Sequence, residues 1–323
     1  MKVVVIDHHG GPGVLATRES PRPVAGPGEV LVRVTHVGLN HLDTWVRRGV
    51  PGHDFHLPRV PGSDVAGTVD GRPVVLHPCW GCGTCRACLA GNQNRCRDFK
   101  IRGENADGGC QPWLAVPAWQ CLPVPAGLEL AGAASMPLAL LTAWHMLHRR
   151  ARVQRGERVL VQAGASGVGV MAIQLARAHG CEVHATASTA AKREAVARLG
   201  ATPWSYDEVG VRNVDVVVDS VGAPTWGAST RALRWGGRLV CCGATGGHEV
   251  ALDLRALFFK QVDVLGSTMG TSADMVDAWA AVGRGEVRPV VHAVLPLSRL
   301  GEAHEMLENR EVVGKLVVTV DDE

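Results

Sequence analysis

The chain has 323 residues, of which 46% are hydrophobic and 20% are charged, and its formal net charge is only +2 at pH 7. This composition is typical of a globular protein with room for two domains, and the near-neutral charge excludes nucleic acid or an anionic membrane as the main partner. No apolar run reaches the roughly 18 residues of a membrane span, and the N-terminus MKVVVIDHHGGPG lacks the apolar core of a signal peptide. Ten cysteines without an export signal fit a reducing compartment, so we expect a cytoplasmic protein.

Short strands broken by turns dominate the chain up to about residue 120. The segments EVLVRVTHVGL (29–39) and DVAGTVDGRPVVLHP (64–78) are rich in β-branched residues and are bounded by glycine and proline. They predict an irregular, mostly β domain. The pattern changes at Pro137, where PLALLTAWHMLHRRA has apolar residues at helical spacing and a proline suited to the first turn of a helix.

From Glu157 onward, apolar strands alternate with helices. RVLVQAG, CEVHATAS, VDVVVDSVG and GRLVCCGA predict strands, and GVGVMAIQLARAHG and AAKREAVARLG predict helices between them. Unbroken apolar strands separated by helices are typical of a parallel sheet that is covered on both faces. VDVLGST (262–268) adds a further strand, followed by one more helix and the closing strand GKLVVTV.

Four cysteines lie close together in the first region. Cys82, Cys85, Cys88 and Cys96 are spaced Cys-x2-Cys-x2-Cys-x7-Cys, which suits one tetrahedral Zn²⁺ ion with no open coordination position. Such a closed site holds a loop and performs no chemistry. Two disulfides, or four free thiols, are the alternatives, and the neighbouring Cys79 leaves open whether it contributes to the lobe.

The turn AGASGVG (163–169) follows a strand and opens a helix, which is the context of a dinucleotide-binding turn. It approximates G-x-G-x-x-G with Gly164, Ser166 in place of the second glycine, and Gly169, while Gly167 adds flexibility. Glycines let the backbone approach a pyrophosphate, whose charge is favoured at a helix start. The alternative is a tight turn with a purely structural role.

The residues after the next strand bear on the choice of cofactor. An acidic residue that would bond the ribose 2′-hydroxyl of NAD is missing at Ala187-Ser188, and Lys192 and Arg193 follow. The lack of a carboxylate removes repulsion of a 2′-phosphate, and a nearby cation attracts one. We therefore expect NADPH, with NADH as the alternative and a merely solvated helix face as the other explanation of the two cations.

Together these motifs resemble the medium-chain dehydrogenase/reductase superfamily over essentially the whole chain. The resemblance is carried by the cysteine segment, AGASGVGVMAIQLA, VVDSVG, GGRLVCCGATGG, VLGSTMG and the closing VGKLVV. It implies an α/β protein with a GroES-like, mostly-β catalytic domain at 1–123 that includes the zinc lobe. A Rossmann domain with a doubly wound parallel sheet is expected at 124–264, and the segment 265–323 is expected to return to the catalytic domain.

Zinc alcohol dehydrogenases of that superfamily also hold a catalytic zinc, and this sequence keeps the frames but not the ligands. GLNHLD has Asn40 where the family has a cysteine ligand, and GSDVAG has Ser63 and Asp64 where it has His-Glu. The third ligand has no clear candidate, because LALLTAWHML offers Thr142. We therefore expect no active-site metal. GLNHLDTWVRRG and LLTAWHML resemble the quinone oxidoreductase and enoyl reductase branch, which works without one.

The resemblance also implies roles for individual residues. Asn40 is expected to be a hydrogen-bond donor or a positioning group, with a structural amide in a turn as the alternative. Asp43 is expected to orient neighbouring groups, with a capping carboxylate as the alternative, and Thr142 to contact the nicotinamide, with helix packing as the alternative. Tyr206, the single tyrosine, resembles an adenosine-phosphate contact, so the proton is expected from water or from His41, His53 or His56. The expected cofactor contacts are Gly164, Ser166, Gly167, Val168, Gly169, Ser188, Lys192, Tyr206, Val221, Gly243, Ser267, Thr268 and Lys315.

The sequence thus predicts an NADPH-dependent reductase of an α,β-unsaturated carbonyl, with an enoyl-CoA thioester among the candidates. Without a Lewis acid an unactivated alcohol is hard to oxidise, whereas a conjugated double bond needs only hydride at its β-carbon and donors to the carbonyl oxygen. A quinone oxidoreductase and a non-catalytic NADPH-binding protein are the alternatives. The resemblance further implies a homodimer.

Overall fold

The computed structural model describes residues 1–321, and the chain forms two compact units. The first contains Met1–Leu138 and the chain from Pro289 onward, and the second contains Ala139–Arg288. The sequence places the boundaries earlier, at 123/124 and 264/265. The first boundary shifts because α3 (Leu130–Ala134) packs against five strands of the first sheet. The second shifts because α9 (Ser272–Gly283) stays with the second unit.

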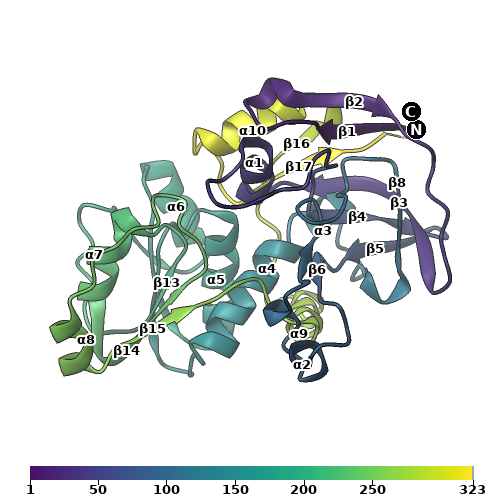
Figure 1. Ribbon diagram of the computed structural model, residues 1–323. Coiled ribbons are helices and arrows are strands. Elements are labelled where there is room, and N and C mark those ends of the chain that lie inside the picture. Colours follow the sequence, from purple (N-terminus) through teal and green to yellow (C-terminus); the bar gives the residue numbers. More distant parts are fainter. Residues whose placement is uncertain (322–323) are drawn as a thin grey trace. The chain divides into compact units, whose positions relative to one another are not determined.

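A seven-stranded sheet forms the core of the first unit (Figure 1). Its order is β16–β17–β3–β4–β5–β9, and β8 also pairs with β3. Only β16 and β17 are parallel, and α10 joins them, since parallel neighbours need a crossover. The elements are β3 (Glu29–Gly38), β4 (Asp64–Val69), β5 (Arg72–Leu76), β8 (Trp113–Pro117), β9 (Cys121–Pro123), β16 (Val291–Pro296), α10 (Leu300–Glu308) and β17 (Lys315–Thr319).

The burial pattern of β3 explains why this strand forms the centre of the sheet. Val32, Val34 and Val37 are buried, as expected for alternating β-branched residues on the core face. The step of three between Val34 and Val37 coincides with a shift in the register against β4, so a bulge keeps both valines in the core.

Smaller elements complete this unit. Strands β1 (Lys2–Ile6) and β2 (Leu15–Glu19) form an antiparallel pair, and β6 (Cys79–Trp80) pairs with β7 (Lys100–Ile101). The remaining helices are α1 (His41–Arg48) and α2 (Arg86–Leu89), with short 3₁₀ turns at Pro12–Val14, Gln93–Arg95, Ala118–Gln120 and Leu297–Arg299.

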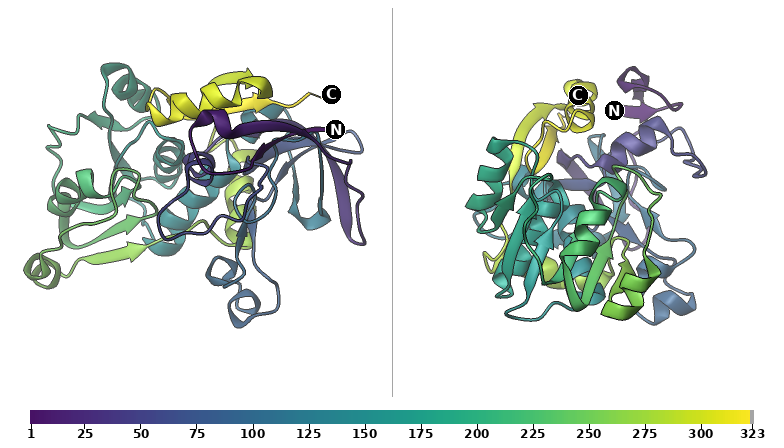
Figure 2. Two further views of the ribbon diagram at one scale, coloured as in Figure 1. Left: turned by 45° about the horizontal axis from the view of Figure 1, so that its top comes forward. Right: turned by 90° about the vertical axis from the view of Figure 1, so that its left-hand side faces the viewer.

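The second unit contains the parallel sheet that the sequence predicts. Its six strands have the order β12–β11–β10–β13–β14–β15, and every neighbouring pair is parallel. The valines of β13 are buried on both faces, because helices cover both (Figure 2). The strands are β10 (Arg158–Val161), β11 (Glu182–Thr186), β12 (Thr202–Trp204), β13 (Val214–Asp219), β14 (Leu233–Cys241) and β15 (Asp263–Gly266).

Right-handed crossovers place the helices on this sheet. Helices α5 (Gly167–Ala178) and α6 (Ala190–Arg198) cover one face, and α7 (Ala223–Ala232) and α8 (Leu254–Lys260) cover the other (Figure 2). Helix α4 (Pro137–Trp144) begins at its proline, as predicted, and continues into a π-helical turn at His145–Arg150. Among the described residues, no helix combines the length and apolarity needed to cross a bilayer.

Candidate active-site and cofactor residues

Asn40 and Asp43 lie at the start of α1 in the first unit and form a capping box. The backbone N–H of Asn40 donates to Oδ2 of Asp43 at 2.8 Å, and the N–H of Gly62 donates to Oδ1 of the same carboxylate at 2.9 Å. Asp43 therefore ties the helix start to the turn before β4. These are the bonds of a capping carboxylate, the alternative to its expected orienting role, and that role stays a prediction. Burial raises the pKa of Asp43 to about 6, although the two backbone N–H groups and Lys315 oppose this shift.

The Asn40 side chain belongs to a buried polar cluster with Asp64 and Lys315. Its amide nitrogen donates to Oδ2 of Asp64 at 3.0 Å, and the Lys315 ammonium donates both to the Asn40 carbonyl oxygen and, at 3.0 Å, to Asp64. The backbone N–H of Leu138 donates to the other Asp64 oxygen at 2.6 Å. Asn40 is 8% exposed and Asp64 fully buried. These bonds use one of the two amide hydrogens of Asn40.

The backbone of β3 passes very close to that of α3 just before Asn40. A Cβ atom on Gly38 would lie 2.1 Å from the carbonyl oxygen of Ala134 in α3, so the position before Leu39-Asn40 has room only for glycine. Sequence reasoning assigned Lys315 to the cofactor and did not foresee its contact with Asn40. A lysine at the start of the apolar strand GKLVVTV was the available signal, because a buried lysine needs a partner.

Helix α1 is anchored at its far end by the buried Arg47. Its guanidinium donates to Nδ1 of His304 at 3.2 Å, to Glu308 at 2.5 Å and to the carbonyl oxygen of Gly10 at 2.8 Å. Both His304 and Glu308 belong to α10. Burial, and secondly the charge of Arg47, lowers the pKa of His304 to about 3.

The lowered pKa of His304 makes part of the free energy of unfolding depend on pH, and a single substitution should remove that part. Its pKa is about 3 in the folded chain and about 6.5 when unfolded, so the unfolded chain binds the extra proton between these values. Stability is complete above about pH 6.5 and falls by up to about 1.4 kcal/mol per pH unit as the pH decreases. We expect His304→Asn, which keeps an acceptor for Arg47, to flatten this slope in urea unfolding at pH 4–7. The same change at the exposed His8 should leave the slope intact, and equal slopes for both variants would contradict the assignment.

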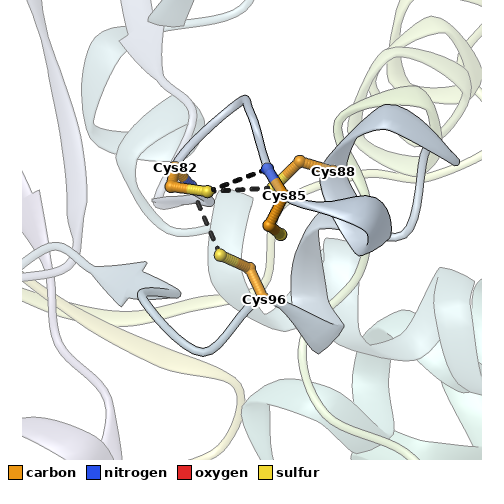
Figure 3. A group of neighbouring side chains, drawn as sticks. All are labelled: Cys82, Cys85, Cys88 and Cys96. Atoms are coloured by element: carbon orange, nitrogen blue, oxygen red, sulfur yellow. Dashed lines mark hydrogen bonds between the residues drawn. The ribbon is translucent and has the colours of Figure 1, made fainter.

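The four cysteines of the lobe meet in the first unit (Figure 3). Their sulfur atoms all lie within 4.8 Å of one another. Four sulfurs at the 2.3 Å bond length of tetrahedral zinc would be about 3.8 Å apart, so the set fits that ion after a small contraction. The N–H of Cys85 donates to Sγ of Cys82 at 3.3 Å, and the N–H of Cys82 to Sγ of Cys96 at 3.4 Å. Cys79 is buried nearby but is not a member of this group.

The glycine-rich turn of the second unit is tightly packed and leads directly into α5. Ala163 adopts a left-handed conformation with φ +51°, and Ser166 caps α5 by accepting a bond from the N–H of Gly169 at 3.0 Å. A Cβ on Gly164 would lie 2.7 Å from that of Ala185, and one on Gly169 would lie 2.3 Å from the oxygen of Ala163. The serine at the second glycine position thus serves as the helix cap, and Gly167 and Val168 form the first turn of α5.

The other expected cofactor residues of this unit lie after the carboxyl ends of its strands, where parallel sheets bind ligands. Ser188 follows β11, Val221 follows β13, Gly243 follows β14, and Ser267 and Thr268 follow β15. Lys192 is half-buried, and Tyr206 is exposed. Arg193 is turned back: its guanidinium donates to the carbonyl oxygens of Ala187 and Ser188 at 3.4 and 3.1 Å.

Thr142 is buried in α4, and its hydroxyl donates to Sδ of Met269 at 3.8 Å. One turn later, Nδ1 of His145 donates to the buried carboxylate of Asp274 at 2.7 Å. The carboxylate also accepts from Arg149 at 2.6 Å, and these bonds hold the pKa of Asp274 well below its usual range despite burial. Sequence reasoning missed this pair, which ties the π-helical turn to the start of α9.

Two family models match the chain. Residues 26–126 match the alcohol dehydrogenase GroES-like domain, and residues 167–284 match the zinc-binding dehydrogenase domain. The acryloyl-coenzyme A reductase of Metallosphaera sedula is 28% identical over 338 residues, covering 99% of this chain and 100% of that protein. The quinone oxidoreductase of Homo sapiens is 26% identical, with 98% and 97% covered. A solved structure described as an NAD-dependent alcohol dehydrogenase is 38% identical, with a TM-score of 0.95 and 99% and 100% covered.

Proposed function

The chain belongs to the zinc-binding dehydrogenase family of the medium-chain dehydrogenase/reductase superfamily, and we propose that it is an NADPH-dependent reductase of the C=C bond in α,β-unsaturated carbonyl compounds. Membership makes it an NAD(P)H-dependent oxidoreductase of the quinone and enoyl reductase branch. Enoyl-CoA thioesters are the preferred substrate class, because acryloyl-coenzyme A reductases are among the relatives. Reduction of quinones is the second candidate, supported by the quinone oxidoreductases.

The Asn40–Asp64–Lys315 cluster carries this proposal. Asn40 stands where zinc alcohol dehydrogenases have a cysteine ligand, and Asp64 stands at the glutamate next to their histidine ligand, whose own place Ser63 takes. Here an ammonium group binds both Asn40 and Asp64. A lysine cation in that place competes with a metal cation for the same oxygen atoms. Metal ions are commonly held by three or more His, Cys, Asp or Glu side chains. Within residues 1–321, the cysteine lobe is the one place where that many lie close enough together. The donor set therefore favours a reaction that needs hydrogen bonds rather than a Lewis acid.

The chain's own residues would bind and polarise the substrate carbonyl. Bound NADPH would supply the hydride for the β-carbon. The second amide hydrogen of Asn40 would stabilise the negative charge that develops on the carbonyl oxygen, while Lys315 and Asp64 fix the orientation of the amide. Asp43 holds the start of α1, and Thr142 would border the nicotinamide. The α-carbon then takes a proton from water or a histidine, so that two hydrogens are added across the double bond.

Two further assignments accompany the proposal. The four thiolates would hold one structural zinc ion per chain. A homodimer would form through β15, an edge strand of the parallel sheet, because β15 and the two elements before it in the chain, β14 and α8, carry exposed apolar side chains. They are Trp235, Leu254, Phe258, Phe259 and Val264. Light scattering of the purified protein should give twice the mass of one chain.

A substrate panel tests the proposed activity. Oxidation of NADPH and of NADH would be followed with enoyl-CoAs, enals, enones and quinones, and reduction of NADP⁺ and NAD⁺ with primary and secondary alcohols. We expect turnover of conjugated carbonyls with a lower KM for NADPH than for NADH. Turnover of quinones alone would move the assignment to the second candidate. Alcohol oxidation with two zinc ions per chain, or tight NADPH binding without any turnover, would overturn it.

A further inference from the structure

A buried chain of hydrogen bonds links two of the loops that are expected to contact the cofactor. It starts at the backbone N–H of Ala163 in the glycine-rich turn, which donates to Oγ1 of Thr186 at 3.0 Å. The Thr186 hydroxyl donates to Oε1 of Gln162 at 2.7 Å, and the amide nitrogen of Gln162 donates to the Ser229 hydroxyl at 3.0 Å. Ser229 in turn donates to Asp219 at 2.8 Å. The four side chains are at most 1% exposed.

The direction of every bond in this chain follows from Asp219. Its carboxylate accepts from the backbone N–H groups of Val221 and Gly222 at 2.8 and 3.0 Å, so it acts as an acceptor, and Ser229 must donate to it. Since Ser229 gives its one hydroxyl hydrogen to Asp219, its oxygen can only accept, and it accepts from the amide nitrogen of Gln162. This fixes the orientation of the Gln162 amide, whose oxygen must face Thr186.

The last step reaches the glycine-rich turn. Because Thr186 gives its one hydroxyl hydrogen to Gln162, its oxygen can only accept, and the N–H of Ala163 donates to it. Ala163 has φ +51°, a conformation that costs a non-glycine residue about 1 kcal/mol or more. The bond that Ala163 donates to Thr186 therefore helps to hold a strained residue at the point where the turn leaves β10.

We propose that Thr186, Gln162 and Ser229 are positioning residues for the cofactor's pyrophosphate. At one end they act on the backbone of Ala163. At the other end they act on Asp219, which holds the backbone of Val221. Strands β10, β11 and β13 are neighbours in the sheet, so the chain crosses its centre beneath both loops. This inference rests on the proposed dinucleotide site, but it concerns residues that would not touch the cofactor themselves.

Thr186→Val is the main test, because valine keeps the shape of threonine and removes the hydroxyl. We expect the dissociation constants of NADPH, NADH and ADP-ribose, measured by fluorescence or calorimetry, to rise about five- to tenfold, in keeping with one lost buried hydrogen bond. Binding of adenosine 2′-monophosphate, which lacks the pyrophosphate, should change less than twofold. Thr186→Ser should restore wild-type affinity for all four ligands.

The matched control is Thr230→Val on α7, where the hydroxyl donates to the carbonyl oxygen of Trp226 and takes no part in the chain. It should leave all four affinities unchanged. If Thr186→Val does not fold, Ser229→Ala interrupts the chain at its middle and should weaken ADP-ribose binding about two- to threefold. Wild-type ADP-ribose affinity in a folded Thr186→Val or Ser229→Ala variant, or equal weakening of adenosine 2′-monophosphate, would overturn the inference. Failure of the wild-type chain to bind any dinucleotide would instead remove the proposed function.

Discussion

Replacing Lys315 with methionine will destabilise the first unit by about 3–5 kcal/mol, because it leaves the Asp64 carboxylate buried without its cation. The Asn40 carbonyl oxygen loses its donor at the same time, so the amide is no longer held in one orientation. We expect kcat to fall about a hundredfold, the loss that a small displacement of a catalytic group produces. Urea unfolding and steady-state kinetics measure the two effects.

A double substitution separates charge from packing in this cluster. Lys315→Met combined with Asp64→Asn removes both charges, and we expect it to recover more than half of the lost stability. It should not recover kcat, since Asn40 still lacks the ammonium group. Lys100→Met, at an exposed position of β7, is the control and should change neither quantity. A Lys315→Met variant as stable as the wild type would show that the cluster does not behave as a buried ion pair.

We expect the purified chain to contain one zinc ion, and replacing Cys85 with serine to reduce this content to almost none. The lobe has little apolar core of its own, so its metal supplies much of its folding free energy. We expect a loss of about 3 kcal/mol, which corresponds to a fall of about 4–5 °C in Tm for a chain of this size. Because the lobe performs no chemistry, the affinity for NADPH should change less than twofold.

The neighbouring thiol provides the control. Cys79→Ala should keep one zinc ion per chain, since this residue lies outside the group of four sulfurs. Elemental analysis and calorimetry of both variants decide the matter. Full zinc content in the Cys85→Ser variant would exclude the lobe as the metal site. Zinc loss in Cys79→Ala would add that residue to the ligands.

What the sequence could predict depended on distance along the chain. The cysteine lobe was predictable because its four sulfurs come from fifteen consecutive residues, and the parallel sheet because each strand and helix has its own periodicity. The family resemblance supplied the frames around Asn40 and Asp64. The bond from Lys315 to Asn40 spans 275 positions, and no local pattern specifies such a contact.

Two other differences have the same origin. The bulge in β3 changes which side chains face the core, and it depends on the pairing with β4 rather than on the strand itself. The unit boundary moved to Leu138 because the small residues of α3 pack closely on Gly38, a contact that composition does not reveal. The capping of α5 by the Ser166 hydroxyl was also missed, although a serine directly before the first helical residue is a signal for that role.

The split of the first unit has a consequence for synthesis on the ribosome. Strand β3 ends at Gly38, but its partner β17 begins at Lys315, after the whole second unit has been translated. The continuous segment 139–288 can therefore fold on the nascent chain before β17 has been synthesised and can pair with β3. During that interval Asn40 and Asp64 lack their lysine, and β3 exposes unpaired backbone groups at residues 36–38, the part of its edge that β17 later covers.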